Sequence, residues 1–151
     1  MVNNNLEFNA EKLADLTFQL LASCQEKENR LARQYNLTDA EFRCLRSMTE
    51  NEFLNNKEIA ERMNLSPSRL TRIIDGLVKK GYVKREIQPN DRRNMQVYLS
   101  EKGIDFVKQL NRAYVNIHTQ ILSEIDKAQH KPLIEAMDNL LRSVNNWLLK
   151  S

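Results

Sequence analysis

Apolar residues return every three or four positions along most of this chain, a spacing typical of helices that bury one face. The first such stretch runs from about Ala10 to Gln34. Its apolar stripe consists of Leu13, Leu16, Leu20, Cys24 and Leu31. The chain has only three glycines and three prolines in 151 residues, too few for an all-β protein with many turns. We therefore expect a mostly α fold.

Two shorter helices follow, and both begin with a capping signal. Thr38 followed by Glu41, and Asn55 followed by Glu58, match the capping box, in which each N-cap side chain and the glutamate three residues later bind each other's backbone N–H groups. A tight connection at residues 64–65 then leads to a fourth helix. Two helices joined by so short a turn form a helix-turn-helix.

The fourth helix is predicted over residues 66–80. Ser66 suits its N-cap, Pro67 its first turn, and Gly81 the position just past its end. Its predicted buried face consists of Leu70, Ile73, Ile74, Leu77 and Val78. Its exposed face gathers hydroxyl and guanidinium groups, on Ser66, Ser68, Arg69, Thr71 and Arg72.

The spacing of apolar residues then changes to the alternation that is typical of strands. Residues 95–99 alternate apolar and polar side chains, and residues 82–87 form a second strand candidate. Between them, residues 88–94 contain the Pro, Asn and Asp of a hairpin tip. A two-stranded hairpin directly after a helix-turn-helix makes a winged helix.

Two further helices complete the chain, for a total of six. Ser100 is predicted to cap a long helix that extends to Ile125, and Pro132 to begin the last one. Their apolar faces consist of Ile104, Val107, Leu110, Tyr114, Ile117, Ile121 and Ile125, and of Leu133, Met137, Leu140, Val144 and Trp147. Long helices at both ends exceed what so small a domain needs. We expect them to pair with a second copy in a homodimer.

Positive charge is concentrated in one segment. Residues 66–94 carry eight basic side chains and three acids, whereas the rest of the chain has a net charge of −2. Such a local excess indicates a phosphate-binding surface, as on a nucleic acid. No stretch approaches the roughly 20 apolar residues of a membrane span, and the N-terminus lacks the pattern of a secretory signal. We expect a cytoplasmic protein with no membrane partner, in which Cys24 and Cys44 are thiols.

The segments "LTDAEFRCL", "NNKEIAERMNLSPSRLTRIIDGLVKKGYVKRE" and "PNDRRNMQVYLSEKG", with the two terminal helices, resemble the MarR family of transcription regulators. The resemblance covers nearly the whole chain. It implies a DNA-binding lobe at residues 37–100 and dimerisation helices at residues 10–36 and 101–151. It also implies a dimeric repressor that occupies a near-palindromic operator in a promoter.

The exposed face of the fourth helix suits the major groove of double-stranded DNA, where arginine binds guanine and hydroxyls bind bases or phosphates. The resemblance implies that an arginine at the wing tip enters the minor groove, oriented by an acid. Arg92 and Arg93 match that arginine, with Arg93 preferred, and Asp91 matches the acid. Lys84 and Arg85 are expected to touch phosphates or nothing.

Family members release DNA in response to small organic ligands, metals or cysteine oxidation. Thr17 stands where the peroxide-sensing branch has its reactive cysteine, and Cys24 and Cys44 are in phase with core residues. Only His118 and His130 are present, which is a poor set of metal ligands. What remains is a small organic effector or no ligand at all, with a redox-responsive regulator of the same fold as the alternative. We expect neither a metal nor a cofactor.

Two other classes of function are disfavoured. No phosphate-cradling glycine motif or catalytic triad signature supports an enzyme. A winged helix that binds another protein should expose apolar or acidic side chains on its fourth helix and wing, yet these segments are basic and rich in hydroxyls.

Overall fold

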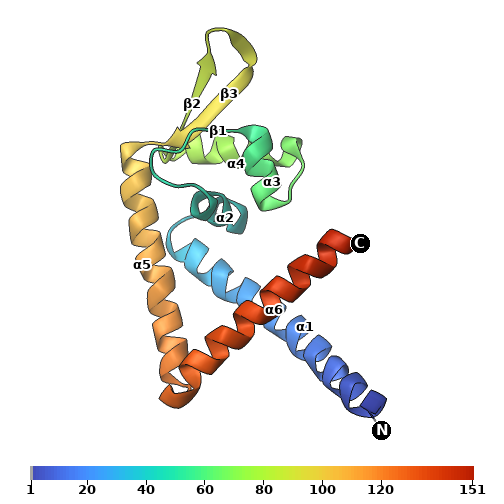
Figure 1. The fold of residues 1–151 in the computed structure, drawn as a ribbon. Helices are drawn as coiled ribbons and strands as arrows, with labels where there is room; N and C mark the ends of the chain where they lie inside the picture. The colour runs from blue at the N-terminus through green and yellow to red at the C-terminus, as the bar shows by residue number, and fades with distance from the viewer. Residues whose placement is uncertain (1) are drawn as a thin grey trace. The chain divides into compact units, whose positions relative to one another are not determined.

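The computed structural model describes the backbone of residues 2–151 and their side chains, except those of residues 2, 3, 88 and 91–94. The chain divides into two compact units, one ending at Leu110 and the other comprising Asn111–Ser151. The first unit contains α1 (Val2–Gln34), α2 (Asp39–Ser47), β1 (Leu54–Asn55), α3 (Asn56–Met63), α4 (Pro67–Lys79), β2 (Val83–Gln88) and β3 (Asp91–Leu99) (Figure 1). The helix α5 (Glu101–Ser123) begins in the first unit and continues into the second. The predicted mostly helical winged helix-turn-helix is confirmed.

The core of the first unit lies where α2, α3 and α4 pack together beneath the sheet (Figure 1). Its fully buried side chains include Phe42, Leu45, Ile59, Leu70, Ile74, Leu77, Val83, Val97 and Leu110. Three of them, on α4, belong to the face predicted to be buried, because their spacing of three or four residues places them on one side of a helix. The other side of α4 faces solvent.

The sheet is antiparallel, in the order β1-β3-β2. The predicted hairpin is confirmed, but its tip is not as wide as predicted, because β3 begins at Asp91 and not at residue 95. The start of β3 was missed because the strand pairing is irregular there. Ile87 pairs with Met95 whereas Gln88 pairs with Asp91, so the alternation of apolar and polar side chains is broken between residues 91 and 95. The two-residue strand β1 was not predicted, since so short a segment carries no periodicity.

The predicted capping signals are confirmed in α2 and α3. The hydroxyl of Thr38 accepts from the N–H of Glu41 at 3.1 Å, and the carboxylate of Glu41 accepts from the N–H of Thr38 at 2.9 Å. Asn55 and Glu58 form the same reciprocal pair. Gly81, with φ of 82°, follows α4 in the left-handed conformation that glycine adopts without strain.

The start of α5 packs tightly against the end of α4. The Ser100 hydroxyl caps α5 by accepting from the N–H of Gly103 at 3.0 Å, and it donates to the carbonyl of Gly81 at 2.6 Å. A Cβ on Gly103 would lie 1.9 Å from the carbonyl oxygen of Tyr82. The ring of Tyr82 stacks on Phe106, with centroids 4.0 Å apart. Residue 103 must therefore be glycine for these segments to meet.

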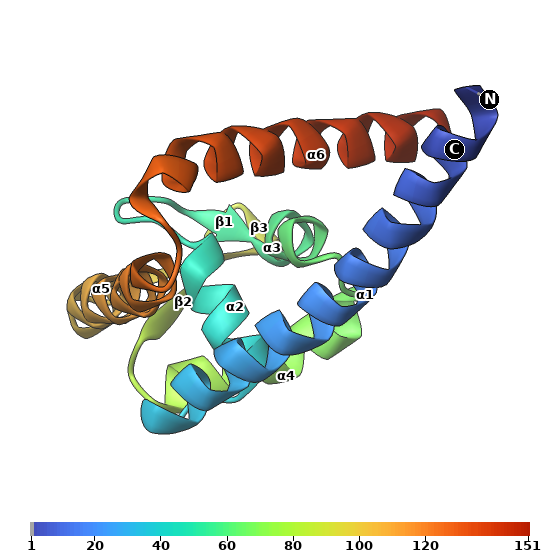
Figure 2. The ribbon, with the colours of Figure 1, turned by 90° about the horizontal axis from the view of Figure 1, so that it is seen from below.

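The first helix is longer than predicted, beginning at Val2 and not near Ala10, because no proline or glycine interrupts the chain before Gln34. Its C-terminal end packs on α2, which Figure 2 shows from below. Leu31 and Ala32 are buried there. Further toward the N-terminus its predicted apolar stripe is exposed, with Leu16 at 56% and Leu20 at 54%.

The second unit contains the rest of α5, a 3-10 turn η1 (Lys127–Gln129) and α6 (His130–Lys150). The prediction placed Ile125 on the long helix, but α5 ends at Ser123. It also placed the start of the last helix at Pro132, but α6 begins at His130, whose Nε2 lies 2.8 Å from the carbonyl oxygen of Leu122 and ties the two helices together. No side chain of α6 is buried. Within residues 2–151, no helix is both long and apolar enough to cross a bilayer.

We predict that Gly103→Ala lowers the free energy of unfolding by about 3 kcal/mol, since a methyl group has no room beside the Tyr82 carbonyl and must push α5 off α4. Urea denaturation followed by circular dichroism measures the change. Gln109→Ala, on an exposed position of the same helix, is the control and should change it by less than about 0.5 kcal/mol. Equal stability of the Gly103 variant and the wild type would contradict the packing described.

Candidate nucleic-acid interface

The helix α4 presents a polar surface to solvent on the side opposite its buried residues. The side chains of Ser66, Ser68, Arg69, Thr71 and Arg72 are all exposed. Leu70, Ile74 and Leu77 are fully buried on the inner side and hold the helix against the core. The sequence-predicted residues of the fourth helix are thus brought together on one rigid, solvent-facing surface. We call these five exposed residues the α4 face.

The N-terminus of α4 is left open by the described side chains. Ser66 occupies the N-cap position as predicted, but its side chain makes no capping hydrogen bond. Its hydroxyl instead lies 3.3 Å from that of Ser68. By contrast, α2, α3 and α5 each have a side chain bound to an N-terminal N–H group. The unpaired N–H groups and the positive end of the helix dipole make this terminus suited to bind an anion.

The helix before α4 is fixed by an arginine that sequence reasoning missed. Arg62 of α3 donates to the carbonyl of Ser47 at 2.8 Å and forms an ion pair with Glu52 in the loop that precedes β1. Hydrogen bonds from Arg62 and Thr49 lower the pKa of Glu52 to about 2. Between the helices, Asn64 ends α3 with φ of 54°, which gives the tight turn predicted at residues 64–65.

The hairpin of β2 and β3, residues 83–99, is the wing. The backbone of Asp91, Arg92 and Arg93 begins β3 beside the irregularity in the ladder. Their side chains lie outside the described residues, so the predicted ion pair of Asp91 with a wing-tip arginine has no structural counterpart here.

The base of the wing is joined to α4 by an ion pair. Nη1 of Arg85, on β2, lies 2.5 Å from Oδ1 of Asp75, on α4. The prediction that Arg85 touches phosphates or nothing missed this partner, because ten residues and a turn separate the two side chains in the sequence. Lys84, the neighbouring residue on the strand, is exposed. Asp75 and Arg85 therefore connect the base of the wing to α4.

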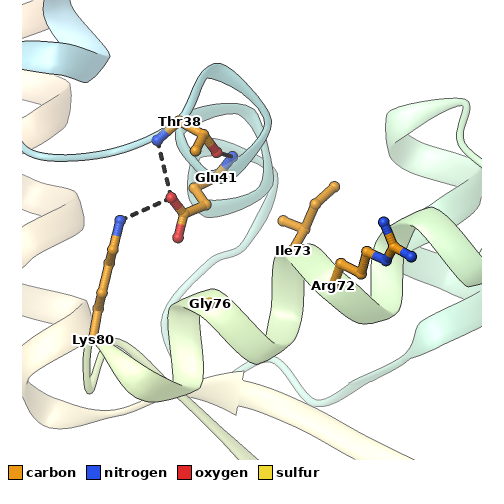
Figure 3. A pocket seen from close by; sticks show the side chains of 6 residues that line it. All are labelled: Thr38, Glu41, Arg72, Ile73, Gly76 and Lys80. Carbon is orange, nitrogen blue, oxygen red and sulfur yellow. Dashed lines mark hydrogen bonds and ion pairs between the residues drawn. The ribbon is translucent and has the colours of Figure 1, made fainter.

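A second ion pair lies on the other side of α4, between Lys80 and Glu41. Lys80 Nζ is 2.8 Å from Oε1 of Glu41, whose side chain is only 7% exposed (Figure 3). Burial would raise the pKa of Glu41, but the hydrogen bonds from Lys80 and Thr38 and the charge of Lys80 outweigh it, and the pKa is lowered. A cavity of about 420 Å³ opens beside this pair, lined by Thr38, Glu41, Arg72, Ile73, Gly76 and Lys80.

The two cysteines have different surroundings. Cys44 is completely buried, as expected of a core residue, and burial, followed by the nearby charge of Glu41, raises the pKa of its thiol to about 12. Cys24 was predicted in the core but is half-buried, with Lys27 Nζ 3.7 Å from its sulfur. Across the part of the chain that the structure describes, no three His, Cys, Asp or Glu side chains gather into a candidate metal site.

Comparison with known proteins gives a consistent result. The sequence model of the MarR family matches residues 37–95. The HTH-type transcriptional regulator SarZ of Staphylococcus epidermidis is 30% identical over 119 residues, which cover 79% of this chain and 74% of SarZ. A mutant MarR from E. coli superposes with a TM-score of 0.76 at 23% identity, over 85% of this chain and 96% of that one. A mutant MepR from S. aureus, solved bound to an oligodeoxyribonucleotide, superposes with a TM-score of 0.60 at 15% identity, over 87% of this chain and 97% of that one.

We predict that Cys44 resists alkylation in the folded protein at pH 8. With a pKa of about 12, only roughly one thiol in ten thousand is ionised at that pH, and burial keeps the reagent away. Mass spectrometry after iodoacetamide treatment measures the modification at each cysteine, and the same treatment in urea, where both cysteines should react, is the control. Rapid labelling of Cys44 without denaturant would contradict its place in the core and would favour a redox role.

Proposed function

The chain belongs to the MarR family, and from this premise we propose that it is a homodimeric repressor that binds a near-palindromic operator through the α4 face and the wing. As a family member it is a DNA-binding transcriptional regulator and not an enzyme. The observation that carries the proposal is the α4 face, which gathers two guanidinium groups and three hydroxyls on a helix whose opposite side is anchored in the core.

In this proposal α4 lies in the major groove, which is wide enough for one helix and displays a different pattern of donors and acceptors for each base pair. Arg69 and Arg72 read guanine, whose O6 and N7 accept hydrogen bonds from two N–H groups of one guanidinium group. Thr71 acts as an acceptor, because its hydroxyl already donates to the carbonyl of Pro67 at 3.1 Å. The open N-terminus of α4, with Ser66 and Ser68, binds a backbone phosphate.

The wing supplies contacts outside the major groove. We assign Arg93 to the neighbouring minor groove, with Asp91 orienting it and Arg92 as the neighbouring basic residue. The backbone irregularity at the start of β3 falls within these residues and is consistent with a tip shaped for a special contact. A narrow minor groove has an enhanced negative potential, so an arginine there reads shape more than base identity.

The dimer in this proposal is formed by residues 10–36 and 101–151, with residues 37–100 as the DNA-binding lobe. Two exposed apolar surfaces support it, one in each unit. In the first unit α1 exposes Leu6, Phe8, Leu13, Leu16, Phe18, Leu20 and Leu21. In the second unit α6 exposes Leu133, Met137, Leu140, Val144 and Trp147. Burying such surfaces is the main driving force of protein association. Two-fold symmetry then places two copies of α4 one helical turn of DNA apart, about 34–36 Å.

The proposed regulator is released from DNA by a small organic ligand. The choice of repression over activation in this proposal rests on the family alone. A redox-responsive regulator is the second candidate, and the half-buried Cys24, with an ammonium group 3.7 Å from its sulfur, is the observation that favours it.

The first test contrasts Arg72→Ala with Arg93→Ala. The DNA is a duplex selected by the wild-type protein from a random-sequence pool, compared with a scrambled duplex. We expect Arg72→Ala to weaken binding to the selected duplex about 10- to 100-fold, with a much smaller effect on the scrambled one, because the loss of a base contact costs about 1–3 kcal/mol. Arg93→Ala should weaken binding to both duplexes and make the salt dependence of affinity shallower.

Fluorescence anisotropy over a range of salt concentrations measures these affinities. Lys108→Ala, which removes one exposed positive charge from α5, is the control and should leave the selectivity between the two duplexes unchanged. Failure to enrich any duplex would contradict the proposed function. Unchanged binding by the Arg93 variant would remove that residue from the interface.

The second test concerns the dimer. The wild-type chain should sediment as a particle of about 35 kDa at micromolar concentration, twice the 17.7 kDa of one chain. Leu140→Glu should shift this mass to that of a monomer, since it places a charge in the middle of the α6 stripe. Asn146→Glu introduces the same charge on the polar side of α6 and should leave the dimer intact. A monomeric wild type would contradict the dimer.

A further inference from the structure

Lys80, at the C-terminal end of α4, is held by groups from two other elements. Its ammonium group donates to the carbonyl of Asn36 at 2.6 Å and to the carboxylate of Glu41 at 2.8 Å. Asn36 follows α1, and Glu41 lies in the first turn of α2. One side chain of α4 therefore connects the end of the first long helix, the start of the second helix and α4 itself.

The buried carboxylate of Glu41 is a fixed anchor for this contact. It accepts from the N–H of Thr38 at 2.9 Å as part of the capping box, so its position follows that of the α2 N-terminus. Gly76 of α4 lies directly beneath it, and a Cβ at that position would stand 2.9 Å from Glu41 Oε2. Glycine is unfavourable inside a helix compared with alanine. At this position it lets α4 approach the carboxylate that Lys80 binds.

The backbone carbonyls at the end of α4 also accept hydrogen bonds from residues at the start of α5. Lys102 of α5 donates to the carbonyl of Lys80 at 3.0 Å, and the hydroxyl of Ser100 donates to the carbonyl of Gly81 at 2.6 Å. Together with the two bonds made by the Lys80 side chain, these contacts fix the C-terminal end of α4 to the elements on three sides of it. We call this set of contacts the α4 junction; its residues are Asn36, Glu41, Lys80, Gly81, Ser100 and Lys102.

The junction is far from the part of α4 that suits base contact. Lys80 lies fourteen positions after Ser66, which corresponds to about 21 Å along a helix. In helix-turn-helix proteins the N-terminal residues of the second helix touch base edges. In Figure 3, Lys80 points toward Glu41, whereas Arg72 extends from α4 beyond Gly76 on the other side of the cavity. Lys80 therefore directs its charge into the protein and not along the α4 face.

We propose that Lys80 is a positioning residue for DNA recognition: it fixes the direction of α4 by binding Glu41 and Asn36, and it does not contact DNA. This inference rests on the proposed function. The geometry makes the effect large, because a tilt of about 5° at the junction moves the other end of a 21 Å helix by almost 2 Å. A shift of that size takes a hydrogen bond of about 2.9 Å well beyond its useful range.

A positioning role and a phosphate contact predict different results for Lys80→Met. If Lys80 positions α4, affinity for the selected duplex falls about 10-fold or more, while affinity for the scrambled duplex and the salt dependence stay near those of the wild type. If Lys80 contacts a phosphate, both affinities fall and the slope of log affinity against log salt becomes shallower by about 1. That second result would overturn the proposal.

Glu41→Gln separates the two explanations further. The substitution removes a negative charge, so a purely electrostatic effect would tighten binding to every duplex. The proposal expects the opposite for the selected duplex, namely a loss of affinity similar to that of Lys80→Met, because the same ion pair is broken. Tighter binding of both duplexes by Glu41→Gln would overturn it.

Two control variants complete the experiment. Lys79→Met removes the charge of the exposed neighbouring residue and should change both affinities by less than about two-fold. Lys80→Arg keeps a cation at the junction and should recover most of the lost selectivity. Circular dichroism at the assay temperature establishes that each variant is folded, so that selectivity is compared only among native proteins. Wild-type protein that enriches no duplex would refute the proposed function itself, whereas an enriched duplex bound equally by wild type and Lys80→Met would refute only the role of Lys80.

Discussion

The backbone of Gly103 lies against the carbonyl of Tyr82, and this close approach determines where α5 begins relative to the end of α4. A Cβ at residue 103 would stand 1.9 Å from that carbonyl oxygen, so only glycine permits the contact. At the start of α5, its cap Ser100 and Lys102 donate to the carbonyls of Gly81 and Lys80. The first turn of α5 thus provides the hydrogen-bond partners for the end of α4. The direction of α4 therefore depends on this turn as well as on its own apolar face.

The opposite end of α4 differs from the starts of its neighbours. In α2, α3 and α5 a side chain binds an N-terminal N–H group, an interaction that stabilises a helix by about 1 kcal/mol. Ser66 occupies the same position in α4 without making that bond. A helix whose C-terminal end is bound on several sides can keep an open N-terminus without fraying, since Leu70 and Ile74 also hold its first turns in the core. The arrangement leaves a helix end that is suited to anion binding facing solvent.

Local signals in the sequence were sufficient for most of the fold, because a capping box or an apolar stripe is complete within a few residues. Thr38 with Glu41 is such a signal, and so is the inner face of α4. Contacts between distant segments could not be predicted from the sequence. A capping box predicts the place of Glu41 in α2, but not its contact with Lys80, 39 positions further along the chain. In the same way the ion pair of Arg85 with Asp75 depends on how the wing folds back. The candidate site was predicted as a set of residues, without the bonds that orient them.

Those bonds change how the positive charge of residues 66–94 is interpreted. By formal charge, the segment has an excess of five positive charges, and this excess alone indicates a uniform phosphate-binding surface. In the structure, however, Lys80 pairs with a buried carboxylate and Arg85 with an aspartate, so these two charges orient α4 and the wing. Arg69 and Arg72 instead extend from the exposed face. Under the proposed function, charge within one short segment serves two purposes, and selectivity for one DNA sequence depends on both, because a guanidinium group reads a base only when its helix is held at the correct angle.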